Sequence, residues 1–155
     1  MTLATGLLMA CGGFLLGVLW MDLIFDSQAG SPRDRGEPAE SVLAAISGYY
    51  HRATTTSQPM GRIIAAVMVV LVGTLVVQAA RGDGPGWLLT ASLVLAGGPI
   101  ALALVRTVPN AVRLGRRAGS LRDQERLARA IYRDHIVCAV AMLAFLVLLL
   151  GRPTG

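Results

Sequence analysis

The sequence predicts an all-α membrane protein with four transmembrane helices in an antiparallel up-down bundle. Three observations lead to this fold class: four long apolar runs, a low content of charged residues, and an uneven distribution of arginine between the connecting segments. Of the 155 residues, 54% are hydrophobic and 15% are charged, whereas soluble domains carry about 25% charged residues. Because this length is typical of one domain, we expect residues 1–155 to form a single integral membrane domain.

Four stretches approach the roughly 20 apolar residues that a helix needs to cross a bilayer. The predicted spans are residues 5–25, 63–80, 87–105 and 133–150. The first span lacks the basic start and the small-residue cleavage site of a signal peptide, so we expect it to be retained. In the third span, Gly97-Gly98-Pro99 should kink the helix, because proline removes a backbone hydrogen bond.

The distribution of arginine predicts the orientation. A short Gly/Pro turn, RGDGPG, joins the second and third spans and makes them an antiparallel hairpin. The connections at residues 26–62 and 106–132, together with Arg133 at the border of the second, hold twelve of the 14 arginines, and only Arg81 and Arg152 lie on the opposite side. Arginine-rich connections stay in the cytoplasm. We therefore expect both loops inside, both termini extracytoplasmic, and the protein in the plasma or inner membrane.

Two further helical features are expected on the cytoplasmic side. The stretch SVLAAISGYYHR, residues 41–52, has apolar residues three to four apart, which predicts an amphipathic helix lying at the membrane interface before the second span. Ser120 and Asp123 approximate a capping box. We therefore expect the fourth helix to begin near Leu121, as a cytoplasmic extension, and to enter the membrane near His135.

A layer of polar side chains is expected at one depth, near the cytoplasmic ends of the four spans. Its members are Asp22, Asp26, Arg62, Arg106, Asn110 and His135. A carboxylate inside a span is costly and needs a partner, which for Asp22 is Arg106 or His135. One hypothesis is a cytoplasm-facing pocket in which His135 acts as a base and arginines hold an anionic oxygen. The alternative is an ion-pair layer that only marks the ends of the helices.

The sequence gives no reason to expect a cofactor, a metal or nucleic acid. Asp22, Asp26, His51 and His135 lack the HxxH or ExxH spacing of metal sites, and the net charge of +5 comes from arginines that flank apolar runs. The two cysteines, Cys11 and Cys138, are expected at different depths, on the order of 15 Å apart along the helices. A disulfide needs Cα atoms within about 7 Å, so we expect none.

Two stretches, RTVPNAVRL and IYRDHIVCAVAML, resemble the small four-helix membrane proteins of the DUF1772, or anthrone-oxygenase-like, family. The matching positions are Pro109, Asn110, Tyr132 and His135, and the spacing of the four spans extends the resemblance over nearly the whole chain. The sequence departs from the family pattern at Cys138, where an arginine is expected, and at Tyr132, where tryptophan is usual.

This resemblance implies a cofactor-free oxygenase that acts on a hydrophobic, anthrone-type phenol. It makes His135 the base, with Arg106 and Asn110 stabilising the oxyanion. A non-catalytic accessory or scaffold protein is the alternative, and a small transporter that uses Asp22 and the Gly-Gly-Pro break is a third. The expected partners are the lipid bilayer and anionic headgroups at the arginine-rich loops; a homo-oligomer or a membrane partner protein is left open.

Overall fold

The computed structural model describes residues 2–30, 40–56 and 58–151, and all of its regular elements are helices. In chain order they are α1 (Leu3–Gly30), α2 (Glu40–His51), the π-helical turn η1 (Arg52–Thr56), α3 (Gln58–Arg81), α4 (Gly86–Ser92), the π-helical turn η2 (Leu93–Gly97), α5 (Gly98–Leu102), the π-helical turn η3 (Ala103–Thr107), α6 (Val108–Gly115) and α7 (Leu121–Leu150).

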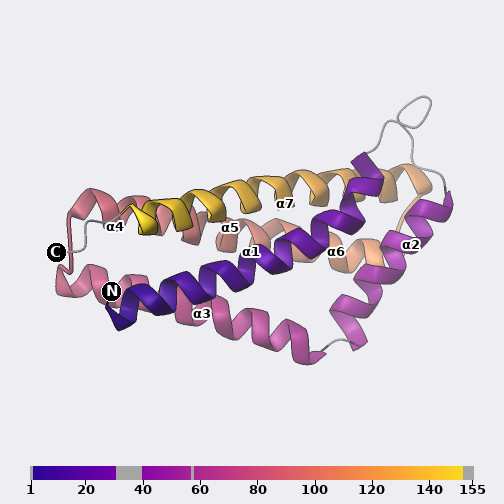
Figure 1. The fold of residues 1–155 in the computed structure, drawn as a ribbon. Coiled ribbons are helices and arrows are strands. Elements are labelled where there is room, and N and C mark those ends of the chain that lie inside the picture. The colour runs from indigo at the N-terminus through magenta and orange to yellow at the C-terminus, as the bar shows by residue number, and fades with distance from the viewer. Residues whose placement is uncertain (1, 31–39, 57, 152–155) are drawn as a thin grey trace.

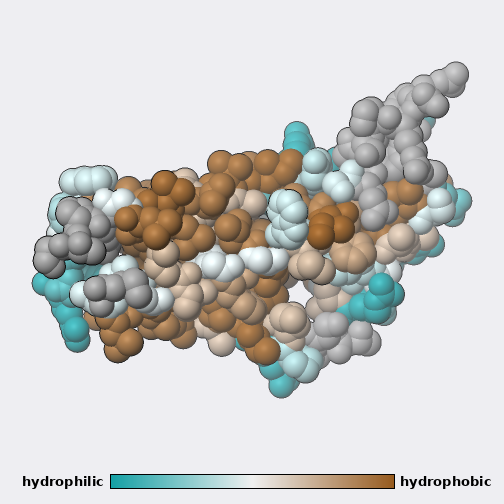
Figure 2. All heavy atoms as spheres, viewed as in Figure 1, coloured by the Kyte–Doolittle hydropathy of each residue, from teal (hydrophilic) through white to brown (hydrophobic). Residues whose placement is uncertain are grey.

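Four helical stretches are long and apolar enough to cross a membrane, as predicted. They are Leu3–Ser27, Pro59–Arg81, Gly86–Gly115 and Leu121–Leu150. Successive stretches run in opposite directions along one bundle, and the start of α1 lies at the same end as the last residues of α7 (Figure 1). Brown, hydrophobic spheres gather over the long helices, and hydrophilic spheres gather toward the two ends (Figure 2).

The third span is longer than the sequence suggested. It continues past Val105 to Gly115, so most of the segment predicted as a loop between residues 106 and 120 is helical. Two π-helical turns, η2 and η3, lie just before Pro99 and Pro109. A proline ring collides with the carbonyl four residues earlier and lacks an N–H, and the wider π turn lets the helix continue. Pro109 and Asn110 consequently lie inside α6 and not in a turn.

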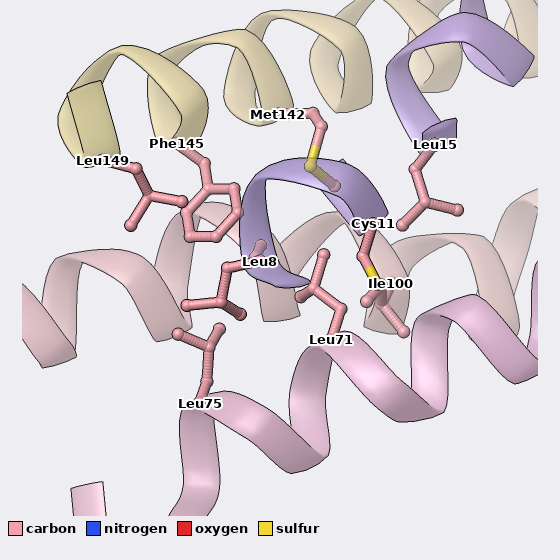
Figure 3. Packing of buried hydrophobic residues seen from close by; sticks show 10 residues of the cluster. Leu8, Cys11, Leu15, Leu71, Leu75, Ile100, Met142, Phe145 and Leu149 are labelled. Carbon is pink, nitrogen blue, oxygen red and sulfur yellow. The ribbon is translucent and has the colours of Figure 1, made fainter. Parts of the chain in front are cut away.

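The four spans enclose one apolar cluster, which we call the bundle core (Figure 3). Its buried members are Leu8, Cys11, Leu15, Leu71, Leu75, Ala96, Ile100, Met142, Phe145 and Leu149. At Gly12, an added Cβ would lie 2.9 Å from Leu146 Cδ2, so α1 and α7 approach closely there. The same addition at Gly13 or Gly17 meets no atom within 4 Å. Of these three glycines, only Gly12 allows a close approach of α1 to a neighbouring helix.

A second apolar cluster, which we call the outer core, lies where α2 and α6 pack against the first half of α7. Its buried members are Leu43, Ile46, Tyr50, Ala111, Leu114, Ala128 and Ile131. An added Cβ at Gly115 would lie 2.8 Å from the backbone nitrogen of His51, so α6 touches α2 backbone to backbone. The amphipathic helix predicted before the second span is present, but its apolar face packs on protein and not on the membrane surface.

Helix α7 begins at the predicted residue. The Ser120 hydroxyl accepts a hydrogen bond from the Asp123 backbone N–H at 3.3 Å, and the Asp123 carboxylate accepts one from the Ser120 backbone N–H at 3.1 Å. This reciprocal capping box satisfies two backbone donors at the helix start. It lets α7 extend as one helix from the outer core into the bundle core.

Candidate functional site

A buried pair, Asp26 and His135, lies between the bundle core and the outer core. His135 Nδ1 is 2.6 Å from Asp26 Oδ2. Asp26 is 1% exposed and His135 is 7% exposed, so water contributes little to the solvation of either group. The pair joins α1 to α7 across 109 residues of sequence. Two ionisable groups can be buried in this way only when each supplies the other with a hydrogen bond and an opposite charge.

Two adjacent tyrosines of α2 complete the hydrogen bonding of the carboxylates. The Tyr50 hydroxyl donates to Asp26 Oδ1 at 2.7 Å, so both oxygens of Asp26 have a partner. The Tyr49 hydroxyl donates to Asp22 Oδ1 at 2.5 Å, and the Tyr49 ring stacks on Phe25 with centroids 4.3 Å apart. The other oxygen of Asp22 lies 3.9 Å from His135 Nε2. These contacts attach α2 to α1 at two successive turns of α1.

The surroundings of the tyrosines keep them protonated. Burial is the largest cause that raises the pKa of Tyr49 above its ordinary value of 10.0, and the hydrogen bond to Asp22 and its negative charge raise it further. Burial also raises the pKa of Tyr50, followed by the charges of Asp26 and Asp22. Each cause disfavours a phenolate beside a carboxylate. Both hydroxyls are therefore hydrogen-bond donors throughout the neutral range.

A second polar contact lies beside the first. Arg106 Nε is 3.2 Å from Asp134 Oδ2, and the Thr107 hydroxyl donates to the same carboxylate at 3.5 Å. The Asp134 side chain is 7% exposed, whereas that of Arg106 is 50% exposed. This contact ties η3 to α7 at the residue before His135. We refer to the two contacts together as the polar layer, which comprises Asp22, Asp26, Tyr49, Tyr50, Arg106, Thr107, Asp134 and His135.

The structure brings together only some of the residues expected at this depth. Asp22 and His135 lie near each other, but Arg106 pairs with Asp134 and not with Asp22. Arg62 is exposed and Asn110 is half-buried; within the described residues, neither side chain has a hydrogen bond or an ion pair. Asp22 and Asp26 are four residues apart and therefore lie on one face of α1, and both carboxylates face His135.

Sequence reasoning missed Tyr49 and Tyr50 as members of the layer. The tyrosines were assigned to the membrane interface, because amphipathic spacing shows which face of a helix is apolar but not what covers that face. The sequence contained one signal for these contacts. Two adjacent tyrosines follow the amphipathic run, and two carboxylates lie one helical turn apart at the end of the first span. The ion pair of Asp134 with Arg106 was not expected either, because Arg106 was considered as a partner of Asp22.

Metal and disulfide chemistry find no support in the part of the chain that the structure describes. Within residues 2–30, 40–56 and 58–151, no group of three or more His, Cys, Asp and Glu side chains is placed to hold a metal ion. Cys11 and Cys138 are both buried and free. The Cys138 thiol donates to the backbone oxygen of Pro99 at 3.7 Å, which ties α7 to the proline region of the third span.

The arrangement at His135 is that of an oriented imidazole. When Nδ1–H donates to Asp26, the ring is held in one tautomer and Nε2 carries the lone pair. Nε2 then lies on the side of Asp22, and both carboxylates stabilise the imidazolium that forms when Nε2 takes up a proton. The chemistry that this geometry permits is proton abstraction, or proton transfer between carboxylates.

The comparisons with known proteins do not add to this picture. No family model matches the chain, and no curated protein or solved structure matches it. The chemistry of the site is therefore carried by its own geometry.

Proposed function

We propose that this chain is an integral membrane enzyme of the cofactor-free oxygenase kind, in which His135 is the general base toward a hydrophobic phenolic substrate. The observation that carries the proposal is the hydrogen bond of 2.6 Å between His135 Nδ1 and the buried carboxylate of Asp26. A carboxylate that orients an imidazole in this way is the usual means of preparing a general base. Asp22 lies 3.9 Å from the second ring nitrogen, where its charge can stabilise the imidazolium.

The reaction needs a base and dioxygen. His135 removes a proton from a methylene group between two aromatic rings, and the carbanion that results is delocalised onto the oxygen of the substrate. Dioxygen adds to this carbon; one oxygen atom becomes the new carbonyl, and the other leaves as water with the two hydrogens of the methylene. The methylene carbon loses four electrons and dioxygen gains four, so no cofactor is required. The resemblance of residues 106–114 and 131–143 to anthrone-oxygenase-like proteins supports this substrate class.

Arg106 and Asn110 are proposed to stabilise the developing oxyanion. Arg106 contacts Asp134 through Nε, and half of its side chain is exposed. Asn110 follows on α6 and its amide has no partner within the described residues. An enolate oxygen is stabilised by positive charge and by hydrogen-bond donors, which Arg106 and Asn110 can supply. Asp26 positions His135, and Asp22 stabilises its protonated form.

The membrane orientation is part of the proposal. The connections at residues 26–62 and 106–132, together with Arg133, hold twelve of the 14 arginines in the sequence, which favours the cytoplasm for the end of the bundle with the polar layer and the extracytoplasmic side for both termini. Trp20, near the polar layer, and Trp87, at the other end of the bundle, are each 67% exposed, as is usual for tryptophans at the two membrane interfaces. Arginines near the boundary, such as Arg133, are then placed to contact anionic lipid headgroups.

A second candidate function is a non-catalytic membrane scaffold. One observation favours it: each of the three carboxylates in the polar layer already has partners within the chain. In that case the layer serves only to hold α2 and α6 against the bundle, and substitutions in it alter stability but no reaction rate.

The two histidines of the chain allow a matched test. Purified protein in lipid nanodiscs is given hydroxylated anthrones, and oxygen uptake is followed for the wild type, His135→Gln and His51→Gln. We expect uptake by the wild type, a loss of roughly 10²–10⁴-fold in His135→Gln, and little change in His51→Gln, whose side chain is exposed. Equal rates in all three proteins, with folding confirmed by thermal unfolding, would leave the scaffold function standing.

A further inference from the structure

The first half of α7 carries a row of arginines. Arg122, Arg126, Arg129 and Arg133 follow one another at spacings of four, three and four residues. At about 100° per residue these side chains lie within roughly 60° of one another on the helix. The opposite face carries Ala128 and Ile131, which are buried in the outer core. The row therefore faces away from the protein interior, and Arg122, Arg126 and Arg133 are exposed.

Part of this row lines a groove. Arg122, Glu125, Arg126 and Arg129 surround an open space of about 300 Å³. Glu125 Oε2 lies 3.7 Å from Arg129 Nη2, with side-chain exposures of 14% and 43%. The lining consists of three arginines and one glutamate, and Asp123 lies close enough to Arg126 to interact with its charge. Glu125 is an ion-pair partner of Arg129 within the lining.

We propose that Arg122, Arg126 and Arg129 form a binding site for a phosphate group. Guanidinium groups bind phosphate oxygens through paired, charge-assisted hydrogen bonds, and arginines one helical turn apart can hold one phosphate between them. A phosphate monoester carries nearly two negative charges at neutral pH, which the guanidinium groups attract. The site does not use His135 or its partners, so it is independent of the proposed oxygenase activity.

The depth of the groove indicates the source of the phosphate. The uncharged run of α7 begins at Ile136. For a helix near the membrane normal, Arg129 then lies about 10 Å beyond the start of this run and Arg122 about 20 Å beyond it. The headgroup region extends only about 5–8 Å beyond the hydrocarbon on each side. Arg133 is within reach of lipid headgroups, whereas the groove is better placed for a soluble phosphate compound.

The test uses the full chain with inorganic pyrophosphate as the probe. Binding to the wild type in a nonionic detergent is measured by titration calorimetry and compared with two triple variants of equal charge. The first is Arg122→Gln/Arg126→Gln/Arg129→Gln, and the second is Arg113→Gln/Arg116→Gln/Arg117→Gln, which removes three arginines at the same end of the molecule but outside the groove. We expect at least about tenfold weaker binding in the first variant and a smaller change in the second.

A second arm separates the two sources of phosphate. Nanodiscs with and without phosphatidylglycerol are compared for their stabilisation of the same three proteins. Phosphatidylglycerol could stabilise the wild type and the second triple variant but not the first, while pyrophosphate does not bind to the wild type. This result would assign the groove to a lipid headgroup. Equal behaviour of both triple variants in both arms, or no binding of either phosphate source to the wild type, overturns the proposal. Binding of an acidic peptide such as oligoglutamate with no binding of pyrophosphate overturns it as well.

Discussion

The bundle core and the outer core are both well packed, but they are covered by different solvents. Large exposed apolar side chains are frequent on α1, α3, the third span and the second half of α7. In the described parts of residues 40–56 and 107–135, the large exposed apolar side chains are Val108 and Leu121. The bundle core thus has an apolar surface suited to lipid, and the outer core has a polar surface suited to water.

The same kind of packing is therefore stabilised by different forces. In the outer core, burial removes apolar surface from water, which is the main driving force of folding. In the bundle core, lipid is as apolar as the interior, so close packing and hydrogen bonds between helices remain as the driving forces. The polar layer lies between the two regions, where burying a charged group costs less free energy than at the centre of the bilayer. It ties α1 and α2 to α7.

The largest expected difference between the two regions is the loss of unfolding free energy when a buried leucine is replaced by alanine. Leu114 in the outer core and Leu71 in the bundle core are both 0% exposed. Leu114→Ala should lower the free energy of unfolding by about 2–5 kcal/mol, because both the transfer energy and the cavity contribute. Leu71→Ala should cost distinctly less, since mainly the cavity contributes in lipid. Steric-trap unfolding in bicelles measures both, and equal losses would remove the distinction between the two cores.

A glycine comparison tests how closely the helices approach. Gly115→Ala places a methyl group 2.8 Å from the backbone nitrogen of His51, so α2 has to shift, and we expect a loss of about 1–3 kcal/mol. Gly12→Ala should cost less, because the nearest atom is the end of the Leu146 side chain. Gly13→Ala meets nothing and serves as the control. The order of the three melting temperatures checks this, and a melting temperature for Gly115→Ala equal to that of Gly13→Ala would contradict the packing of α6 on α2.

Alkaline pH should weaken the attachment of α2. The pKa values of Tyr49 and Tyr50 are raised in the folded protein above 10.0, so the unfolded chain loses these phenolic protons first. Below about pH 10 neither state has lost them and the stability is complete; above it, the unfolded state is favoured increasingly. The melting temperature should fall as pH rises above about 10, and this fall should be shallower in Tyr50→Phe. If the melting temperature of Tyr50→Phe fell with pH as steeply as that of the wild type, this would argue against the burial of the Tyr50 hydroxyl beside Asp26.

The sequence could predict the features that depend on residues within one helix. The four spans, the capping box at Ser120 and the shared face of Asp22 and Asp26 follow from local periodicity or spacing. The continuation of the third span was missed, because Arg106 and Pro109 looked like a helix end and the π turn that accommodates the proline has no clear sequence signature. The tyrosine partners were missed, because periodicity does not tell which helices meet.

The pairing of Asp26 with His135 is the central claim, and a double-mutant cycle tests it most directly. Unfolding of the wild type, Asp26→Asn, His135→Gln and the double variant is measured in nanodiscs near pH 7. The control cycle uses the longer ion pair of Glu125 and Arg129, whose side chains are 14% and 43% exposed. We predict that either single substitution in the buried pair costs about 3–5 kcal/mol and that the double variant costs far less than their sum. The control pair should show a coupling below about 1 kcal/mol. Additive losses at Asp26 and His135 would contradict the account.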